Sequence, residues 1–161
     1  DGGSGGTSTT STKDWVVTVD GSMLIDGLKG GVMNSTVSSS VAGVNDDEID
    51  GAWLNYSTGP VSVGYRMSEI QGGGAGAVGK NVEAYAVAFN VNDSMSVSIA
   101  TQDVEYDTPS GTNTTETIDA LNASYTMGAA SVRATFSEAD NDSGVTADTD
   151  EHMEISLVLS F

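Results

Sequence analysis

The chain has 161 residues, of which 38 % are hydrophobic, 23 are acidic and five are basic, so its net charge is −18. This balance argues against nucleic acid as a partner and against phosphate binding, and the lack of cysteine excludes Cys-based zinc sites and thiol nucleophiles. No apolar run approaches the roughly 18–20 residues of a membrane helix. Gly, Ser, Thr, Asn and Asp dominate the remainder, which predicts a mainly β fold with many turns.

The N-terminal third is the least regular part of the sequence. Residues 1–12 are rich in Gly, Ser and Thr and predict a flexible loop or linker. A strand is predicted over 13–19, followed by a two-residue turn at Asp20-Gly21 and a return strand over 22–33. Residues 26–50 combine glycines, a Ser/Thr-rich stretch and an acidic end, so we predict a long loop there, which could fold inward.

From residue 51 onward apolar and polar residues alternate. Residues 61–68 read Val-Ser-Val-Gly-Tyr-Arg-Met-Ser, and the chain ends in a similar run over 152–161. Alternation with period two gives each strand one face suited to lipid and one suited to water. The strands predicted in this part of the chain are 51–57, 61–69, 82–91, 94–106, 117–127, 130–138 and 152–161.

The connections between these strands are of two kinds. Short turns are predicted at 58–60, 92–93 and 128–129, about 35 residues apart, and long polar loops at 69–81, 104–116 and 138–151. Short turns at one end and long loops at the other are typical of a transmembrane β-barrel, with the short turns in the periplasm. We therefore predict an all-β, antiparallel transmembrane β-barrel to which the chain supplies eight or nine strands. Because bacterial barrels have even strand numbers, an odd count indicates either that the strand over 22–33 is wrongly predicted or that N-terminal strands are missing, and we favour the second.

The water-facing residues of the predicted strands are mostly Ser, Ala, Gly, Asn and Thr. An eight-stranded barrel fills its interior with large side chains, so small residues favour a wider, water-filled barrel, or one with an element folded inside it. The candidate pore-lining residues are Arg66, Arg133, Glu154, Ser62, Ser98, Asn122 and Thr135.

Most acidic residues fall at the long-loop end of the predicted strands, where a solvated rim explains them. Two clusters could also bind Ca²⁺ through carboxylate oxygens, although neither has the spacing of an EF-hand loop. Their members are Asp46, Asp47, Glu48, Asp148, Asp150 and Glu151. No other metal or cofactor is expected.

Residues 52–65, 86–98 and 123–128 resemble, in the style of their repeated hairpins, the C-terminal half of general diffusion porins of alphaproteobacteria. The resemblance covers about residues 50–161. It implies a sixteen-stranded, homotrimeric pore in the outer membrane of a Gram-negative bacterium, through which small hydrophilic solutes and ions diffuse passively. The final strand, with Leu157, Leu159 and Phe161, resembles the segment by which the barrel-assembly machinery recognises such proteins.

The same resemblance implies that Arg66 and Arg133 oppose acids on an inward-folded loop and so create a transverse field. The alternative is that each arginine pairs with an acid on the wall. An enzyme is not expected, because the lone His152 has no nucleophile motif around it and the glycines at 72–76 are not followed by a lysine-serine pair. Two other functions stay open, namely a non-conducting barrel that serves as an adhesin or phage-binding surface, and a soluble, acidic, calcium-binding β-sandwich of a surface layer.

Overall fold

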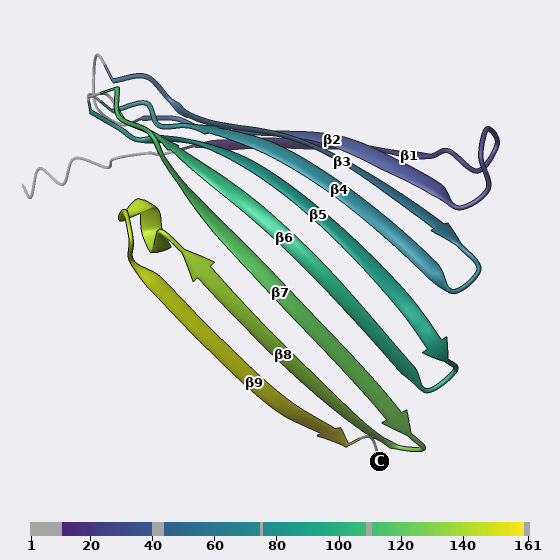
Figure 1. The fold of residues 1–161 in the computed structure, drawn as a ribbon. Helices are drawn as coiled ribbons and strands as arrows, with labels where there is room; N and C mark the ends of the chain where they lie inside the picture. Colours follow the sequence, from purple (N-terminus) through teal and green to yellow (C-terminus); the bar gives the residue numbers. More distant parts are fainter. Residues whose placement is uncertain (1–10, 40–43, 75, 109–110, 160–161) are drawn as a thin grey trace, which may run out of the picture.

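A computed structural model describes residues 11–39, 44–74, 76–108 and 111–159 of the chain. The described residues form one antiparallel sheet in which nine strands lie in chain order, each hydrogen-bonded to the next (Figure 1). The strands are β1 (Thr12–Asp20), β2 (Leu28–Val37), β3 (Asp47–Thr58), β4 (Val61–Gln71), β5 (Gly79–Asn92), β6 (Met95–Asp107), β7 (Thr114–Met127), β8 (Ala130–Asp140) and β9 (Thr149–Leu159). A single 3₁₀ turn, η1 (Asp142–Gly144), lies between β8 and β9. No helix within these ranges is long and apolar enough to cross a membrane.

The three predicted short turns are confirmed. β3 and β4 are joined by Gly59-Pro60, and β7 and β8 by Gly128-Ala129, since Thr58 pairs with Val61 and Met127 pairs with Ala130. Both glycines have a positive φ, of 54° and 58°, the left-handed conformation that tight hairpins require and that glycine adopts without strain. All three turns lie at one end of the sheet, opposite the longer loops (Figure 1).

The N-terminal prediction is partly wrong. The second strand is Leu28–Val37 rather than 22–33, and the connection at Asp20-Gly21 is not a two-residue turn but a longer one that extends to Gly27. The backbone amide of Gly21 donates to the carbonyl of Leu28 at 2.8 Å and closes this turn. Gly27, at φ 81°, is pressed against the end of β3, where an added Cβ would lie 1.9 Å from the carbonyl oxygen of Ser57.

The predicted long loop over 26–50 is also wrong, because most of it is wall. Residues 28–37 form β2 and residues 47–50 begin β3, so this segment does not fold inward as a whole. The prediction was wrong because the glycines at 30 and 31 suggested a loop. They are strand residues, paired with Leu54 and Trp53. The prediction of a flexible segment over 1–12 falls mainly outside the described residues, and Thr12 already belongs to β1.

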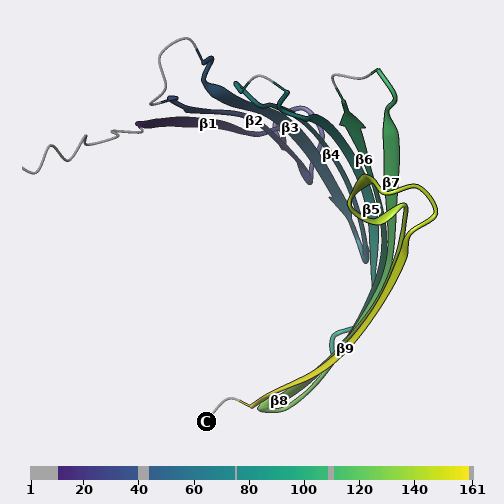
Figure 2. The ribbon, with the colours of Figure 1, turned by 90° about the vertical axis from the view of Figure 1, so that its left-hand side faces the viewer.

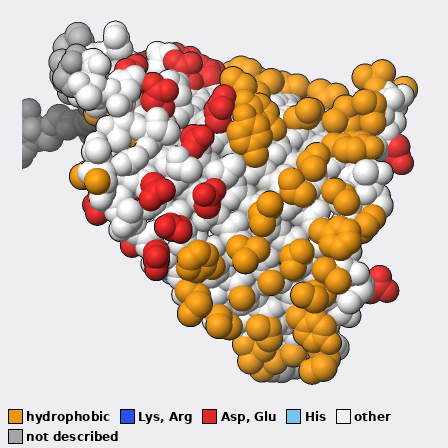
Figure 3. Space-filling view, in the orientation of Figure 1, with side chains coloured by type: hydrophobic (Ala, Val, Ile, Leu, Met, Phe, Trp, Pro, Cys, Tyr) orange, Lys and Arg blue, Asp and Glu red, His pale blue; other side chains and the backbone are white. Residues whose placement is uncertain are grey.

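The sheet is curved, and its two faces differ in chemistry. Figure 2 shows it as an arc, and Figure 3, which views the convex side, shows a broad hydrophobic area beside a region of Asp and Glu side chains. Consecutive register pairs place apolar residues next to each other around the arc, as in the row of Val87, Ile99, Leu121, Phe136 and Met153.

These convex side chains are not covered by other parts of the described chain. Ile99 is 60 % exposed and Leu121 is 53 % exposed, and the buried residues of the described part are only Gly21, Val82, Val104 and Glu116. A soluble sandwich would bury one apolar face against a second sheet. An apolar face without a covering layer is instead suited to a hydrocarbon environment.

The register also settles the faces of β3. Trp53 pairs with Arg66 and so lies on the concave side, whereas Leu54, which pairs with Tyr65, lies on the convex side. The sheet is not closed within the described residues, since β1 and β9 each have one strand neighbour only.

A matched pair of substitutions on β6 tests which face meets lipid. Val97→Lys puts a charge in the middle of the convex apolar area, and we expect it to lower the free energy of unfolding in lipid vesicles by about 2–4 kcal/mol. Ser98→Lys puts the same charge on the concave face, where water solvates it, and should change that free energy much less. Urea titrations followed by tryptophan fluorescence measure both. Equal losses would contradict the assignment of the faces.

Candidate functional site

The concave face carries all seven candidate pore-lining residues. Five of them fall in one row, because Ser62, Ser98, Asn122, Thr135 and Glu154 are linked through successive register pairs, with Ala88 between the first two. The hydroxyl of Thr135 donates to Asn122 Oδ1 at 2.8 Å, and the hydroxyls of Ser57 and Ser62 are 2.9 Å apart. These residues form a continuous polar line across the wall.

Arg66 lies above this row, on the side of the long loops. One of its guanidinium nitrogens donates to Gln102 Oε1 at 3.1 Å. Its cross-strand partner Trp53 lies over Gly31, where an added Cβ would come within 2.6 Å of the indole Nε1. The surface here is hollowed by about 570 Å³, and its lining is mainly small, with Gly64, Ala84, Ala86, Ala100 and Ala120 among Trp53, Asn55, Arg66 and Gln102.

Arg133 lies below the polar row, on β8. It pairs with Ser124 on one side and with Ser156 on the other. Within the described residues neither Arg66 nor Arg133 forms an ion pair; the one contact within ion-pair distance is between His152 Nε2 and Glu154, at 3.9 Å, and it joins opposite charges only when the imidazole is protonated. The described wall therefore gives no support to the alternative in which each arginine is neutralised by a neighbouring acid.

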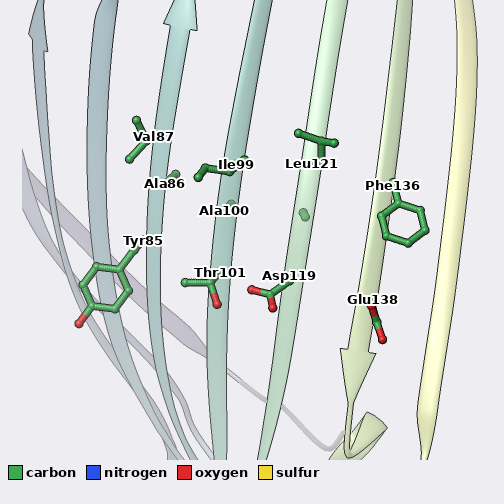
Figure 4. A pocket seen from close by; sticks show the side chains of 11 residues that line it. Tyr85, Ala86, Val87, Ile99, Ala100, Thr101, Asp119, Leu121, Phe136 and Glu138 are labelled. Atoms are coloured by element: carbon green, nitrogen blue, oxygen red, sulfur yellow. The ribbon is translucent and has the colours of Figure 1, made fainter.

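The border between apolar and polar residues on the convex face is sharp. Figure 4 shows the apolar side chains of Val87, Ile99, Leu121 and Phe136 in one row, with Tyr85, Thr101, Asp119 and Glu138 in the row beyond it. A shallow hollow of about 430 Å³ lies between these side chains.

Two tyrosines mark this border on β4 and β5. The rings of Tyr65 and Tyr85 are 4.9 Å apart, and both hydroxyls donate to the carboxylate of Glu83, at 3.3 and 3.4 Å. An aromatic ring with a polar end suits the interface between hydrocarbon and water.

A cluster on the concave face near the long loops was not predicted from the sequence. The hydroxyl of Tyr106 donates to Glu116 Oε2 at 2.7 Å, and the ammonium of Lys80 lies 4.7 Å from the centre of the Tyr106 ring. Glu116 is only 7 % exposed. The hydrogen bond to Glu116, followed by burial, raises the pKa of Tyr106 to about 12. The only signal in the sequence was the alternation that gives Lys80, Tyr106 and Glu116 the same face.

The β8–β9 loop folds onto this cluster. The backbone of Gly144 lies against the Tyr106 ring, since an added Cβ would be 2.9 Å from it. The side-chain amide of Asn141 donates to the carbonyl of Thr115 at 2.9 Å and fixes the start of the loop on β7. This loop thus has a fixed contact with the concave face, whereas most of the predicted segment 26–50 is wall.

The predicted calcium clusters do not bring their carboxylates together. Asp47 and Glu48 are successive strand residues and point to opposite faces, as do Asp150 and Glu151. Asp46 and Asp47 accept backbone amides of Ser39 and Gly73, at 2.8 and 2.7 Å, and so hold loops together. Among the described residues no three potential ligands converge on a metal position. The remaining member, Asp148, lies in the β8–β9 loop.

The predicted assembly signal is described in part. Leu157 and Leu159 lie on the convex face of β9, next to Val132 and Ala130 of β8. Phe161 lies outside the described residues.

The sequence matches no family model and no curated protein. The structure is similar to that of outer-membrane expressed OmpT of Vibrio cholerae, with a TM-score of 0.74 and 12 % identity, over 94 % of this chain and 56 % of that one. It is also similar to in-vitro folded OmpT, an outer membrane protein of the same organism, with a TM-score of 0.72 and 12 % identity, over 93 % and 55 % of the two chains.

These likenesses confirm the predicted fold class, an antiparallel sheet of the outer-membrane β-barrel type, here with nine strands and not closed. The chain spans about half the length of the structures it matches. The neighbours are outer-membrane proteins, in agreement with the location predicted from the sequence.

The contact between Tyr106 and Glu116 predicts a pH dependence of the β8–β9 loop. Because the folded state holds the pKa of Tyr106 near 12, above its ordinary value of 10.0, the stabilisation is complete below pH 10.0 and is lost as the pH rises toward 12. A nitroxide spin label on Val145→Cys should become more mobile over that range. In the Tyr106→Ala background, which removes the ring that Gly144 packs on, the label should be mobile already at neutral pH.

The control for this experiment is the same label on Val78→Cys, in the β4–β5 loop, which should show no such transition. A Val145 label whose mobility is the same in the Tyr106→Ala background and in the unaltered protein would contradict the anchoring role of Tyr106.

Proposed function

We propose that the chain forms part of an outer-membrane porin, a water-filled channel for the passive diffusion of small hydrophilic solutes and ions. The observation that carries the proposal is the division of one curved, single-layered sheet into an exposed apolar convex face and a polar concave face with small side chains. No chemical step and no cofactor are part of this function.

The convex face supports a location in the membrane. Apolar residues recur on every second position of β4 over Val61–Met67, and of β9 over Met153–Leu159, which corresponds to about 20 Å along each strand. Each exposed Leu, Ile or Phe side chain gains about 1.5–3 kcal/mol on leaving water. Carboxylates on the same face lie beyond this band, gathered at the long-loop end, with isolated ones at the short-turn edge (Figure 3).

The concave face supports a conducting pore over a closed barrel. Side chains that fill a narrow barrel must be large, but the centre of this face is mainly small. It has Ala84, Ala86, Ala100, Ala120 and Gly64 beside Trp53, Arg66 and Gln102. The nine strands also form an open arc rather than a complete turn (Figure 2). An adhesin-like barrel with a packed interior would need bulk at these positions.

The length of the match supports a size for the complete barrel. If nine strands correspond to 56 % of the matched chain, the whole would hold about sixteen strands, an even number as in bacterial barrels. The resemblance to alphaproteobacterial porins implies the same number and a homotrimer, and we propose both for the complete protein, together with insertion by the barrel-assembly machinery.

Single-channel recording tests the proposal. The complete protein, extracted from its native membrane with mild detergent, should give large, steady openings in a planar bilayer, closing in three equal steps. Protein shown to be folded and inserted that repeatedly fails to conduct would overturn the porin function and favour a closed barrel whose loops are functional.

Two neighbouring substitutions on β6 test which face lines the channel. Ala100→Trp adds a large side chain to the hollow on the concave face, so we expect the single-channel conductance to fall. Ile99→Trp adds a side chain of the same type to the lipid face and should leave the conductance unchanged. A reduction by Ile99→Trp alone would contradict the orientation of the wall.

A further inference from the structure

Two aromatic residues of the described strands, Trp53 and Tyr106, lie on the concave face. Tyr106 is held by Glu116 and covered by the β8–β9 loop. Trp53 has no comparable partner, because the indole Nε1–H meets no hydrogen-bond acceptor among the described residues. An indole on the water-filled side of the wall therefore has both an apolar surface and a donor to offer a solute.

The backbone of β2 fixes the position of this indole. An added Cβ at Gly31 would lie 2.6 Å from the indole Nε1 and 2.9 Å from Cε2, so this part of the ring lies against the wall. The side chain of Trp53 is half-buried, and it also lines the concave hollow of about 570 Å³. The ring is thus held in place before a solute arrives, which lowers the entropy cost of binding.

Planar polar groups complete the lining of the hollow. The guanidinium of Arg66 reaches across Ala84 to donate to Gln102 Oε1 at 3.1 Å, which leaves Gln102 Nε2 and other guanidinium N–H groups without a partner among the described residues. Asn55 is exposed, and its Oδ1 lies over Gly64, where an added Cβ would be 2.7 Å away. Two strand spacings, about 10 Å, separate Trp53 from Ala84, so the hollow has room for a ring between the indole and these groups.

We propose that this hollow binds one ring of a neutral monosaccharide or a similar cyclic polyol during its passage. The proposal rests on the porin function proposed above and adds a solute class to it. A sugar ring has an apolar face of C–H groups, which suits the indole of Trp53. Its rim of hydroxyls can both donate and accept hydrogen bonds, which suits the amides of Asn55 and Gln102 and the guanidinium of Arg66.

The charges of the concave face favour a neutral solute over an anion. No carboxylate is among the described residues that line the hollow, but on the described concave face as a whole the carboxylates outnumber the arginines and lysines. The carboxylates are Asp14, Asp20, Asp47, Glu116, Asp150 and Glu154, and the cations are Lys29, Arg66, Lys80 and Arg133. A solute without charge crosses this surface without electrostatic cost.

The experiment is single-channel recording of the complete protein in planar bilayers with D-glucose on both sides. D-sorbitol at the same concentration is the reference, because it raises the viscosity and carries hydroxyls but has no ring. Glucose should lower the conductance further than sorbitol does, and the difference should saturate. The half-saturating concentration should be the same in about 0.1 M and about 1 M KCl, since salt screens charged ligands but not neutral ones.

Substitutions assign the effect to the hollow. Trp53→Leu keeps apolar bulk over Gly31 but removes the aromatic ring, and should raise the half-saturating concentration about five- to tenfold, whereas Trp53→Phe should retain most of the binding. Asn55→Ala, at an exposed position, should raise it about fivefold. The matched control is Trp15→Leu, which removes the other tryptophan of this chain from the convex face of β1 and should change nothing. Steady openings without sugar show that each variant is assembled.

Each other outcome contradicts a defined part of this account. Equal effects of glucose and sorbitol on a conducting protein would overturn the binding site, as would saturation that Trp53→Leu and Asn55→Ala both leave unchanged. D-glucuronate that saturates at a lower concentration than glucose, and more so in dilute KCl, would overturn the neutral solute class in favour of an anion. Absence of any conductance would instead overturn the porin function.

Discussion

The structure depends on one constraint, which is that every backbone N–H and C=O inside hydrocarbon needs a hydrogen-bond partner within the protein. An unsatisfied group there costs several kcal/mol, so only helices and closed sheets cross membranes. Nine strands paired in chain order meet this requirement for all the strands between β2 and β8. The short turns at one end make this pairing local, because each hairpin fixes the register of the next.

Once the register is fixed, the period of two determines everything else about the wall. A shift of a single residue would exchange the faces of a whole strand, placing Arg66 in lipid and Tyr65 in the lumen. Two features stabilise the observed register against such a shift. They are the apolar rows across consecutive strands and the contact of Tyr65 and Tyr85 with Glu83 at the border. The same period places the carboxylates of β4, β5 and β6 on the convex face.

The sequence alone predicted the strands and turns where the alternation of apolar and polar residues agreed with the positions of turn residues. β4 to β9 and their three short turns were predicted within a few residues, and the seven candidate wall residues all lie on the predicted face. It was not sufficient at β2, where glycines suggested a loop. Gly31 is a strand residue because the indole of Trp53, from the next strand, occupies the space of its missing side chain. That reason lies in a tertiary contact that no local pattern contains. The fold of the β8–β9 loop onto Tyr106 depends likewise on residues from three separate elements.

The direction of the strands limits how the proposed barrel can close. β1 and β9 are both odd members of an up-and-down sheet, so they run in the same direction. Direct pairing between them would be parallel, and so would pairing between β9 and the β1 of a second copy related by rotation about the barrel axis. An antiparallel closure requires an odd number of further strands between the two edges. Seven satisfy this condition and give the total of about sixteen that the partial match suggests, whereas six or eight would leave one parallel seam. The strand that meets β9 must also present apolar residues beside Ile155 and Leu157 on its convex side, since these side chains are 67 % and 62 % exposed at the open edge.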